Sequence, residues 1–179
     1  MKTILQVILS ILFIVFSFSC SNNKEIAAKQ KAEQPQKNLL NNKEEINSAL
    51  RHFAYFHKDS LIRLEAVKKL IDEEVLKHVA YFDSNVSVRT LATNKINNEE
   101  YLKQVAYFDD NESVRCVAVN KISSESYLKH IAYFDESPRV RQLAVSKIQS
   151  ANILSHVIKF DKDLDVRKTA INMLSNLKT

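Results

Sequence analysis

Apolar positions recur along the chain with a period of 26 residues, beginning near residue 50. One column of this pattern contains only phenylalanine, at Phe56, Phe82, Phe108, Phe134 and Phe160. Another contains only alanine, at Ala66, Ala92, Ala118, Ala144 and Ala170. A third contains Leu70, Ile96, Ile122, Ile148 and Leu174. Agreement of several columns over five copies predicts an array of repeats, in which each unit buries its apolar face against its neighbours.

Each unit contains two columns of residues typical of helix starts, so we predict two short helices per unit. These columns are Asp72, Asn98, Ser124 and Ser150, and Asp59, Asn85, Asn111, Ser137 and Asp163. In the third unit, the predicted helices span residues 99–108 and 112–122. Leu102, Val105 and Phe108 fall on one side of the first of these helices, so we expect Phe108 in the core. Helices of about ten residues are marginal alone, which favours a solenoid of mutually supporting units.

The composition agrees with an all-helical fold and narrows the function. The 179 residues include no glycine, on which hairpin turns and phosphate-binding loops depend. The net charge is +5, but residues 44–179 carry 20 basic and 19 acidic residues. Because nucleic-acid binding requires basic residues clustered on one surface, we expect no nucleic-acid partner. The sequence therefore predicts an all-α solenoid of about five two-helix repeats over residues 44–179.

The start of the chain predicts an exported and anchored protein. An apolar run from Ile4 to Phe18 is typical of a signal peptide over residues 1–19, and it is shorter than the roughly 20 residues of a membrane-spanning helix. Cys20 follows a small residue, and this ending resembles the lipobox of bacterial lipoproteins, in which the cysteine receives a diacylglyceryl group. The resemblance implies lipid attachment at Cys20 and a membrane-anchored protein of the bacterial cell envelope, in the periplasm or on the surface. The alternative is a chance cysteine after an ordinary signal peptide.

Residues 20–43 are rich in Ser, Asn, Lys, Gln and Ala, which predicts a flexible tether between the lipid and the solenoid. Cys116 is the only other cysteine, so we expect no internal disulfide. One free thiol cannot supply a metal site or cluster, and we expect no metal and no cofactor besides the lipid.

Residues 81–96 and 107–122 share the pattern Tyr-Phe-Asp-x-x-x-x-Val-Arg-x-x-Ala-x-x-Lys-Ile, which resembles HEAT-type α-solenoid repeats. The resemblance covers residues 43–179 and implies a scaffold or a binding surface. A second relative, the leucine-rich repeat variant, is similar in period. Its N-terminal iron–sulfur cluster is not expected here, because the cysteines for it are absent.

Two charged columns recur in register and predict a structural ladder of ion pairs. They contain Asp83, Asp109, Asp135 and Asp161, and Arg89, Arg115, Arg141 and Arg167. A partly buried arginine needs a carboxylate partner, so each arginine is expected near the aspartate of its own unit or of the next.

A tyrosine column beside a lysine column is the candidate partner-binding stripe. The stripe comprises Tyr55, Tyr81, Tyr107, Tyr133, Lys77, Lys103 and Lys129. Tyrosine offers contact area at low entropy cost, and lysine can meet the carboxylates of a partner. The alternative is that the rings only cover the grooves between repeats.

A histidine column is interpreted as half-buried junction residues, with a pH-sensitive stripe as the alternative. Its members are His52, His78, His130 and His156. Stacked helices lie about 8 to 10 Å apart, so these side chains are too distant to share one metal ion.

These features favour a non-enzymatic, membrane-anchored adaptor that binds another protein through its helical repeats. No pair of acids stands out as a catalytic acid and base. A purely structural spacer is the first alternative. An enzyme or enzyme chaperone similar to HEAT-like lyases is the second, and it would need a pocket that interrupts the array, whereas the 26-residue step is uninterrupted.

Overall fold

The computed structural model describes residues 42–177, and all regular secondary structure in this range is α-helical. A helix over residues 42–56 comes first. It is followed by α2 (Ser60–Lys69), α3 (Glu73–Phe82), α4 (Val86–Lys95), α5 (Glu99–Phe108), α6 (Glu112–Lys121), α7 (Glu125–Phe134), α8 (Pro138–Val145), α9 (Ala151–Phe160) and α10 (Leu164–Asn176). The predicted signal peptide, Cys20 and almost all of the predicted tether lie outside the described residues.

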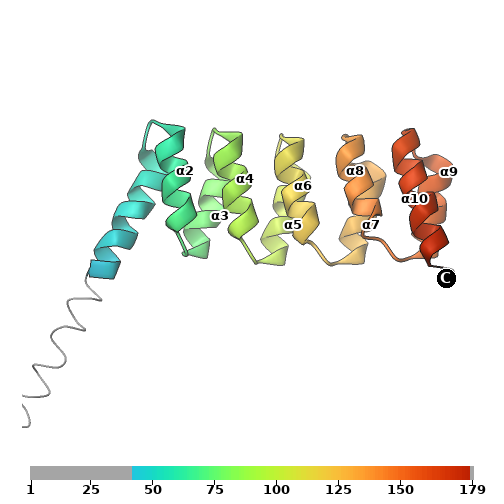
Figure 1. Ribbon diagram of the computed structural model, residues 1–179, viewed down its shortest axis with the longest axis horizontal. Helices are drawn as coiled ribbons and strands as arrows, with labels where there is room; N and C mark the ends of the chain where they lie inside the picture. Colours follow the sequence, from blue (N-terminus) through green and yellow to red (C-terminus); the bar gives the residue numbers. More distant parts are fainter. Residues whose placement is uncertain (1–41, 178–179) are drawn as a thin grey trace, which may run out of the picture. The chain divides into compact units, whose positions relative to one another are not determined.

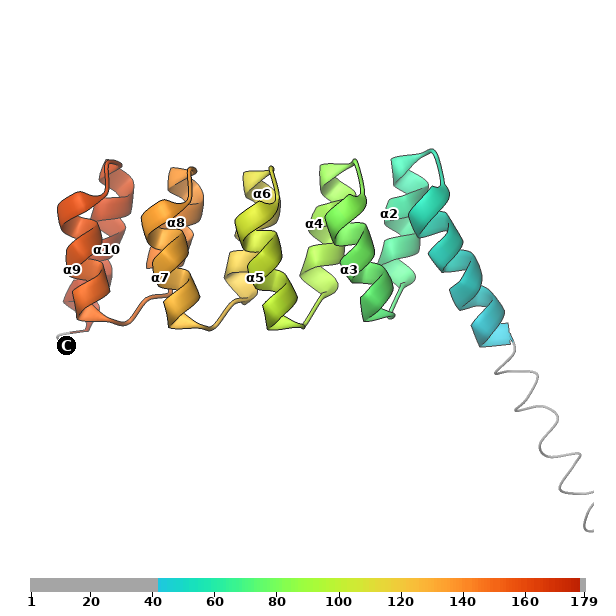
Figure 2. The ribbon, with the colours of Figure 1, turned by 180° about the vertical axis from the view of Figure 1, so that it is seen from behind.

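From Ala49 onward the helices form one compact unit, in which they alternate between two rows. The A row consists of the helical residues 49–56, α3, α5, α7 and α9, and the B row consists of α2, α4, α6, α8 and α10. From α3 onward, each A helix packs against the B helix that follows it, and helices of one row contact their equivalents in the next pair. Figures 1 and 2 show the two rows from opposite sides. This succession of similar helix pairs is an α-solenoid arrangement, which confirms the predicted fold class.

The predicted helix starts are confirmed. The Asn85 side chain accepts hydrogen bonds from two main-chain N–H groups in the first turn of α4, and the Asp72 side chain does the same for α3. Such bonds satisfy N–H groups that would otherwise lack a partner. Ser124, Ser137 and Ser150 precede α7, α8 and α9 without a side-chain bond of this kind. The helix α5 spans its predicted range, and α6 ends one residue before its predicted end.

Three of the B helices, α2, α4 and α6, end without glycine because the chain turns through extended residues whose side chains are buried. Leu70, Ile96 and Ile122 follow α2, α4 and α6, with φ between −76° and −65° and ψ between 133° and 138°. All three side chains belong to the core. No residue in the range 42–177 has a positive φ. Buried apolar residues thus replace the left-handed glycine that ends many helices.

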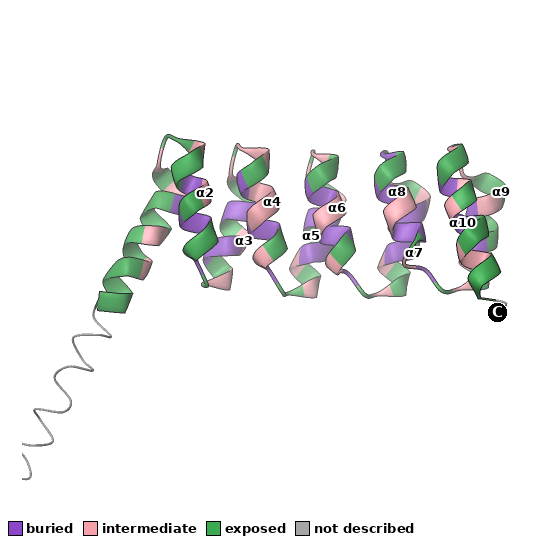
Figure 3. Cartoon of the chain, in the orientation of Figure 1, coloured by how far each residue is buried: buried purple, intermediate pink, exposed green. Residues whose placement is uncertain are grey.

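The core lies between the two rows of helices, as the buried segments of Figure 3 show. In the third unit, α5 contributes Leu102, Val105 and Ala106, and α6 contributes Val114 and Ala118. The same positions recur in the neighbouring units, so the core continues from one helix pair to the next. Each short helix is therefore stabilised by burial against its neighbours rather than by its own length.

The prediction that Phe108 lies in the core is wrong. Its side chain is 69% exposed, although Leu102, Val105 and Ala106 of the same helix are buried. These three residues, at positions i, i+3 and i+4, already form the buried arc of the helix. At about 100° per residue, Phe108 points about 110° away from the centre of that arc. Its apolar character therefore does not place it inside.

Each junction between units is closed by an arginine and an aspartate whose side chains are nearly buried. The arginine Nε atom lies 2.7–3.0 Å from a carboxylate oxygen in the pairs Arg63–Asp83, Arg89–Asp109, Arg115–Asp135 and Arg141–Asp161. A second guanidinium nitrogen reaches the other carboxylate oxygen in every pair, so the contact is bidentate. Of the two partners that the sequence left open, the arginine pairs with the aspartate of the next unit.

The same guanidinium groups also bond the main chain of their own units. Arg89 donates to the carbonyl oxygen of Asp83 at 2.9 Å, just after α3 ends. The Asp109 carboxylate that pairs with Arg89 accepts in turn from the main-chain N–H of Asn111 at 2.9 Å. Each pair therefore ties a B helix to the loop before it and to the loop of the next unit. Arg167 has no following unit in the described range, and it donates to the carbonyl oxygen of Asp161.

Two further columns link the units, and sequence analysis does not identify either of them. One column donates from a lysine ammonium to carbonyl oxygens at the end of the preceding B helix, and its members are Lys95, Lys121 and Lys147. The other accepts main-chain N–H groups at the start of the next A helix, and its members are Glu73, Glu99 and Glu125. The 26-residue spacing of these charges is the signal that could have identified both.

Removing an arginine from an internal junction is expected to cost far more stability than the same change in the last unit. In Arg115→Met, the Asp135 carboxylate stays nearly buried without its partner, and we expect the free energy of unfolding to fall by about 3 to 5 kcal/mol. Arg167→Met breaks no bidentate ion pair, and we expect a loss below about 1 kcal/mol. Urea unfolding followed by circular dichroism measures both losses. Equal losses would contradict the role assigned to the junction pair.

The Asp161 carboxylate is expected to make stability depend on acid pH. Burial alone would raise its pKa, but hydrogen bonds from the Arg141 guanidinium and from the Asp163 N–H outweigh burial and hold the pKa below its ordinary value. A carboxylate whose pKa is lower in the folded than in the unfolded state stabilises the fold above its unfolded pKa of about 3.9. This contribution is lost as the pH falls through the folded pKa.

We therefore expect Asp161→Asn to lower the free energy of unfolding at neutral pH and to flatten its decrease between about pH 5 and about pH 2. Urea unfolding at a series of pH values measures the slope. Val157→Ala is the control, because it removes a buried apolar group and no carboxylate, and it should keep the slope of the parent protein. A parental slope in Asp161→Asn would show that this carboxylate is not linked to folding.

Candidate functional site

A row of exposed phenylalanines follows the A helices. We define the Phe ridge as Phe56, Phe82, Phe108, Phe134 and Phe160, whose exposed fractions lie between 61% and 71%. Each of them is the last residue of its A helix, so successive rings are separated by one step of the array. Large apolar patches on a protein surface usually mark an interaction site. The Phe ridge is therefore the candidate functional site.

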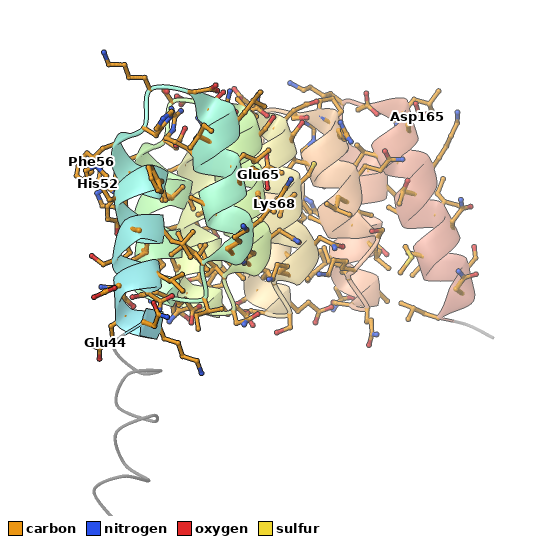
Figure 4. The ribbon with its side chains drawn as sticks, turned by 60° about the vertical axis from the view of Figure 1, so that its left-hand side comes forward. Glu44, His52, Phe56, Glu65, Lys68 and Asp165 are labelled. Carbon is orange, nitrogen blue, oxygen red and sulfur yellow. The ribbon has the colours of Figure 1, made fainter. Side chains whose placement is uncertain are left out.

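A histidine one turn earlier contacts the ring in four of the five units. The ring centroids lie 4.6–5.3 Å apart in the pairs His52–Phe56, His78–Phe82, His130–Phe134 and His156–Phe160. The i, i+4 spacing places both rings on the same side of the helix, as Figure 4 shows for His52 and Phe56. Gln104 takes the place of the histidine in the third unit. These four histidines are exposed, so the prediction that they are half-buried is wrong.

The tyrosines of the predicted stripe reach across the junctions to the histidine of the next unit. Their ring centroids lie 4.3–5.0 Å from the partner in the pairs Tyr55–His78, Tyr107–His130 and Tyr133–His156. Tyr107 also stacks on Tyr127, with 5.6 Å between the centroids. Tyr81 is the most exposed of the four tyrosines, and Gln104 stands in the histidine position of the unit that follows it.

The lysines of the stripe contact groups of their own chain. Lys77 pairs with Glu74 at 2.7 Å, and Lys103 pairs with Glu100 while its ammonium lies 4.0 Å from the centroid of the Tyr127 ring. Lys129 is exposed, and its ammonium lies 5.7 Å from the centroid of the Tyr133 ring. Binding of a partner by this stripe stays a prediction.

Grooves lie between successive A helices, and aromatic rings form their walls. One of them has a volume of about 460 Å³ and lies between Phe108 and Phe134, with Tyr107 and His130 beside them. A second groove, of about 260 Å³, also contacts Phe108, and a third, of about 250 Å³, also contacts Phe134. The B helices pack more closely on one another than the A helices do, which leaves space between the A helices. Consecutive grooves are thus separated by a single ring of the Phe ridge.

Charged side chains follow the Phe ridge in an uneven pattern. The residues two positions after each phenylalanine are all exposed, and in order they are Lys58, Ser84, Asp110, Glu136 and Lys162. Asp110 and Glu136 both line the groove between Phe108 and Phe134. The aspartates immediately after Phe108 and Phe134 are already paired with arginines, so they add no net charge. The ridge is therefore acidic at its centre and basic at its two ends.

Metal binding, reaction at a free thiol and membrane spanning each require particular groups among the described residues. Within residues 42–177, no cluster of three or more His, Cys, Asp or Glu side chains could hold a metal ion. Burial raises the pKa of the Cys116 thiol, which disfavours the reactive thiolate. None of the helices in this range is long and apolar enough to span a membrane.

Comparison with family models, with curated proteins and with solved structures finds no match for this chain.

Sequence analysis missed the Phe ridge because it took the buried arc of the helix to be wider than it is and counted Phe108 with Leu102 and Val105. The helical position of Phe108 was the available signal, since it stands well outside the arc of Leu102, Val105 and Ala106. A column that holds phenylalanine in all five units at a surface position is unusual for a residue with only a structural role.

Phe108→Ala is expected to change the free energy of unfolding by less than about 1 kcal/mol, because most of this side chain is exposed in the folded protein. Ile122→Ala is the matched comparison, because Ile122 is fully buried, and it should cost about 2 to 5 kcal/mol. Urea unfolding measures both changes. A loss at Phe108 as large as that at Ile122 would mean that the ring belongs to the core after all.

Proposed function

We propose that this protein is a non-enzymatic adaptor of the bacterial cell envelope, anchored to a membrane by a lipid on Cys20 and binding another protein along the Phe ridge. The Phe ridge is the observation that carries the proposal. Five aromatic rings at equal steps along the array expose apolar surface to water, which opposes solubility unless a partner covers it. Aromatic residues are also the residues that most often dominate protein–protein binding.

The anchoring part of the proposal is supported by the sequence. The apolar run from Ile4 to Phe18 and the small residue before Cys20 resemble the leader of a lipoprotein, and residues 20–43 have the composition of a tether. A linker of about 20 flexible residues has a root-mean-square reach on the order of 25 Å. Such a reach would hold the helical repeats clear of the lipid headgroups and leave the Phe ridge accessible.

The repeat architecture supports a binding role rather than catalysis. The pattern that resembles HEAT-type repeats is typical of scaffolds. Aromatic rings line the groove between Phe108 and Phe134, and its guanidinium and one of its carboxylates, those of Arg115 and Asp135, are engaged in an ion pair. The spacer alternative rests on a different observation, the three columns of links between units, which would stiffen an array of any function.

Photocrosslinking in the native envelope tests the proposal. A photoreactive amino acid at Ser84 or Lys162, beside the ridge, is expected to give discrete adducts with one partner protein. The same group at Asn94 or Asn120, which are exposed on B helices, is the control and should not give these adducts. Equal adducts from both faces, or none from either, would favour the spacer.

A second set of variants separates loss of binding from loss of fold. Phe82→Ser with Phe108→Ser and Phe134→Ser should abolish the adducts while circular dichroism stays unchanged. Leu61→Ser with Leu164→Ser and Ile171→Ser removes three exposed apolar residues of B helices and should leave the adducts intact. Adducts that survive the loss of the three phenylalanines would contradict the proposed site.

A further inference from the structure

The charge pattern of the Phe ridge disfavours a second copy of this chain as its occupant. When two complete ridges pair in parallel, each charged residue of one copy faces the identical residue of the other copy. When they pair antiparallel, Lys58 meets Lys162 and Asp110 meets Asp110. Like charges brought together at an interface oppose association. The ridge therefore fits a different molecule, and the sign of its charges indicates which kind.

The centre of the ridge is suited to positive charge. The Glu136 side chain is 82% exposed, and one carboxylate oxygen lies 3.2 Å from the Arg115 guanidinium, which already holds Asp135. Asp110 is exposed on the opposite side of the same groove. Two exposed carboxylates beside aromatic walls favour lysine or arginine side chains, which gain from both the charge and the ring faces. Lys58 and Lys162 disfavour basic residues at the two ends.

The spacing of the grooves suits a polyproline II segment. From α3 onward, successive A helices contact one another, and packed helices lie about 8 to 10 Å apart. A groove occurs at each of these three steps. A polyproline II helix advances about 9.3 Å in each turn of three residues, so every third side chain meets the next groove. In a β-strand, side chains on one face are about 6.8 Å apart, which does not match this step.

The separation of the grooves favours the same thin, extended chain over an α-helix. The groove between Phe108 and Phe134 shares Phe108 with the second groove and Phe134 with the third, so one of these rings stands wherever two grooves meet. An α-helix with its side chains is about 10 to 12 Å wide and would contact only the tips of the rings. A polyproline II chain can place proline rings between aromatic rings one turn at a time.

We propose that the Phe ridge binds an extended, proline-containing segment of a partner protein, with apolar residues three positions apart in successive grooves and basic residues opposite Asp110 and Glu136. This inference rests on the proposed adaptor function and adds the chemistry of the partner.

Fluorescence anisotropy with synthetic peptides and the full chain tests the inference. The probe is a labelled peptide of about fifteen residues with proline at every third position and one lysine in each of the two central turns. One comparison peptide has the same composition with proline at every fourth position, a second has glutamate in place of lysine, and a third is an amphipathic α-helix of the same charge. We expect the first peptide to bind at least about tenfold more tightly than each of the others.

Variants of the chain then locate the binding. Asp110→Lys with Glu136→Lys should lower the affinity for the lysine peptide at least about tenfold and should raise the affinity for the glutamate peptide, both relative to the parent protein. Glu65→Lys with Asp165→Lys makes the same change of net charge on α2 and α10, at two exposed residues that line none of the three grooves and that Figure 4 shows apart from Phe56. This pair of changes should leave both affinities within about twofold. Phe108→Ser with Phe134→Ser should abolish binding of the lysine peptide.

Each other outcome overturns the inference in a recognisable way. Equal binding of the peptides with proline at every third and at every fourth position would exclude a polyproline II partner. Tighter binding of the helical peptide would indicate an α-helical partner instead. Sedimentation that shows a dimer, lost in Phe108→Ser with Phe134→Ser, assigns the ridge to a second copy. If no peptide binds while photocrosslinks at the ridge persist, the inference fails and the adaptor function stands; if the crosslinks are absent as well, both fail.

Discussion

The pairing of each arginine with the aspartate of the next unit is the contact on which the rest of this structure depends. Helices of ten residues are too short to persist alone, so every helix pair needs a neighbour in a defined position. The Arg89 guanidinium provides that definition, because its bidentate contact with Asp109 allows one orientation and its bond to the Asp83 carbonyl oxygen fixes the loop of its own unit. A group this well buried is stable only when its partner is present.

The regular step that these pairs impose explains the candidate site. Lysines such as Lys121 hold the B helices close together by bonding the carbonyl oxygens of the preceding B helix, while glutamates such as Glu73 hold the starts of successive A helices. The A helices remain less closely packed than the B helices, and their last residues are phenylalanines that stand between grooves. Equal spacing of rings and grooves is thus a consequence of the junctions, and it is the property that makes a partner with its own regular period a good match.

Residues that recur every 26 positions predicted most of the fold, because repeats, helix caps and the spacing of apolar residues are local signals. Asn85 and Asp72 mark helix starts by their own side-chain chemistry, and the apolar arc of Leu102 and Val105 repeats with the helix. The choice of Asp109 rather than Asp83 as the partner of Arg89 could not be predicted, since it depends on how two units stack. The exposure of Phe108 was missed for a different reason: the apolar arc of the helix was taken as wide enough to include it, whereas burial stops at Leu102, Val105 and Ala106.

The sequence indicated aromatic columns on the A helices but not how far each of them is exposed. Tyr107 and Lys103 form contacts within the solenoid, whereas the neighbouring phenylalanine column carries the exposed rings.

A double-mutant cycle on Arg89 and Asp109 tests most directly whether the junction pair governs the array. We predict that Arg89→Met and Asp109→Leu each cost about 3 to 5 kcal/mol, while the double variant costs clearly less than their sum, because an apolar pair leaves no buried charge. Additive losses would contradict the account, since they would mean that the two side chains do not depend on each other.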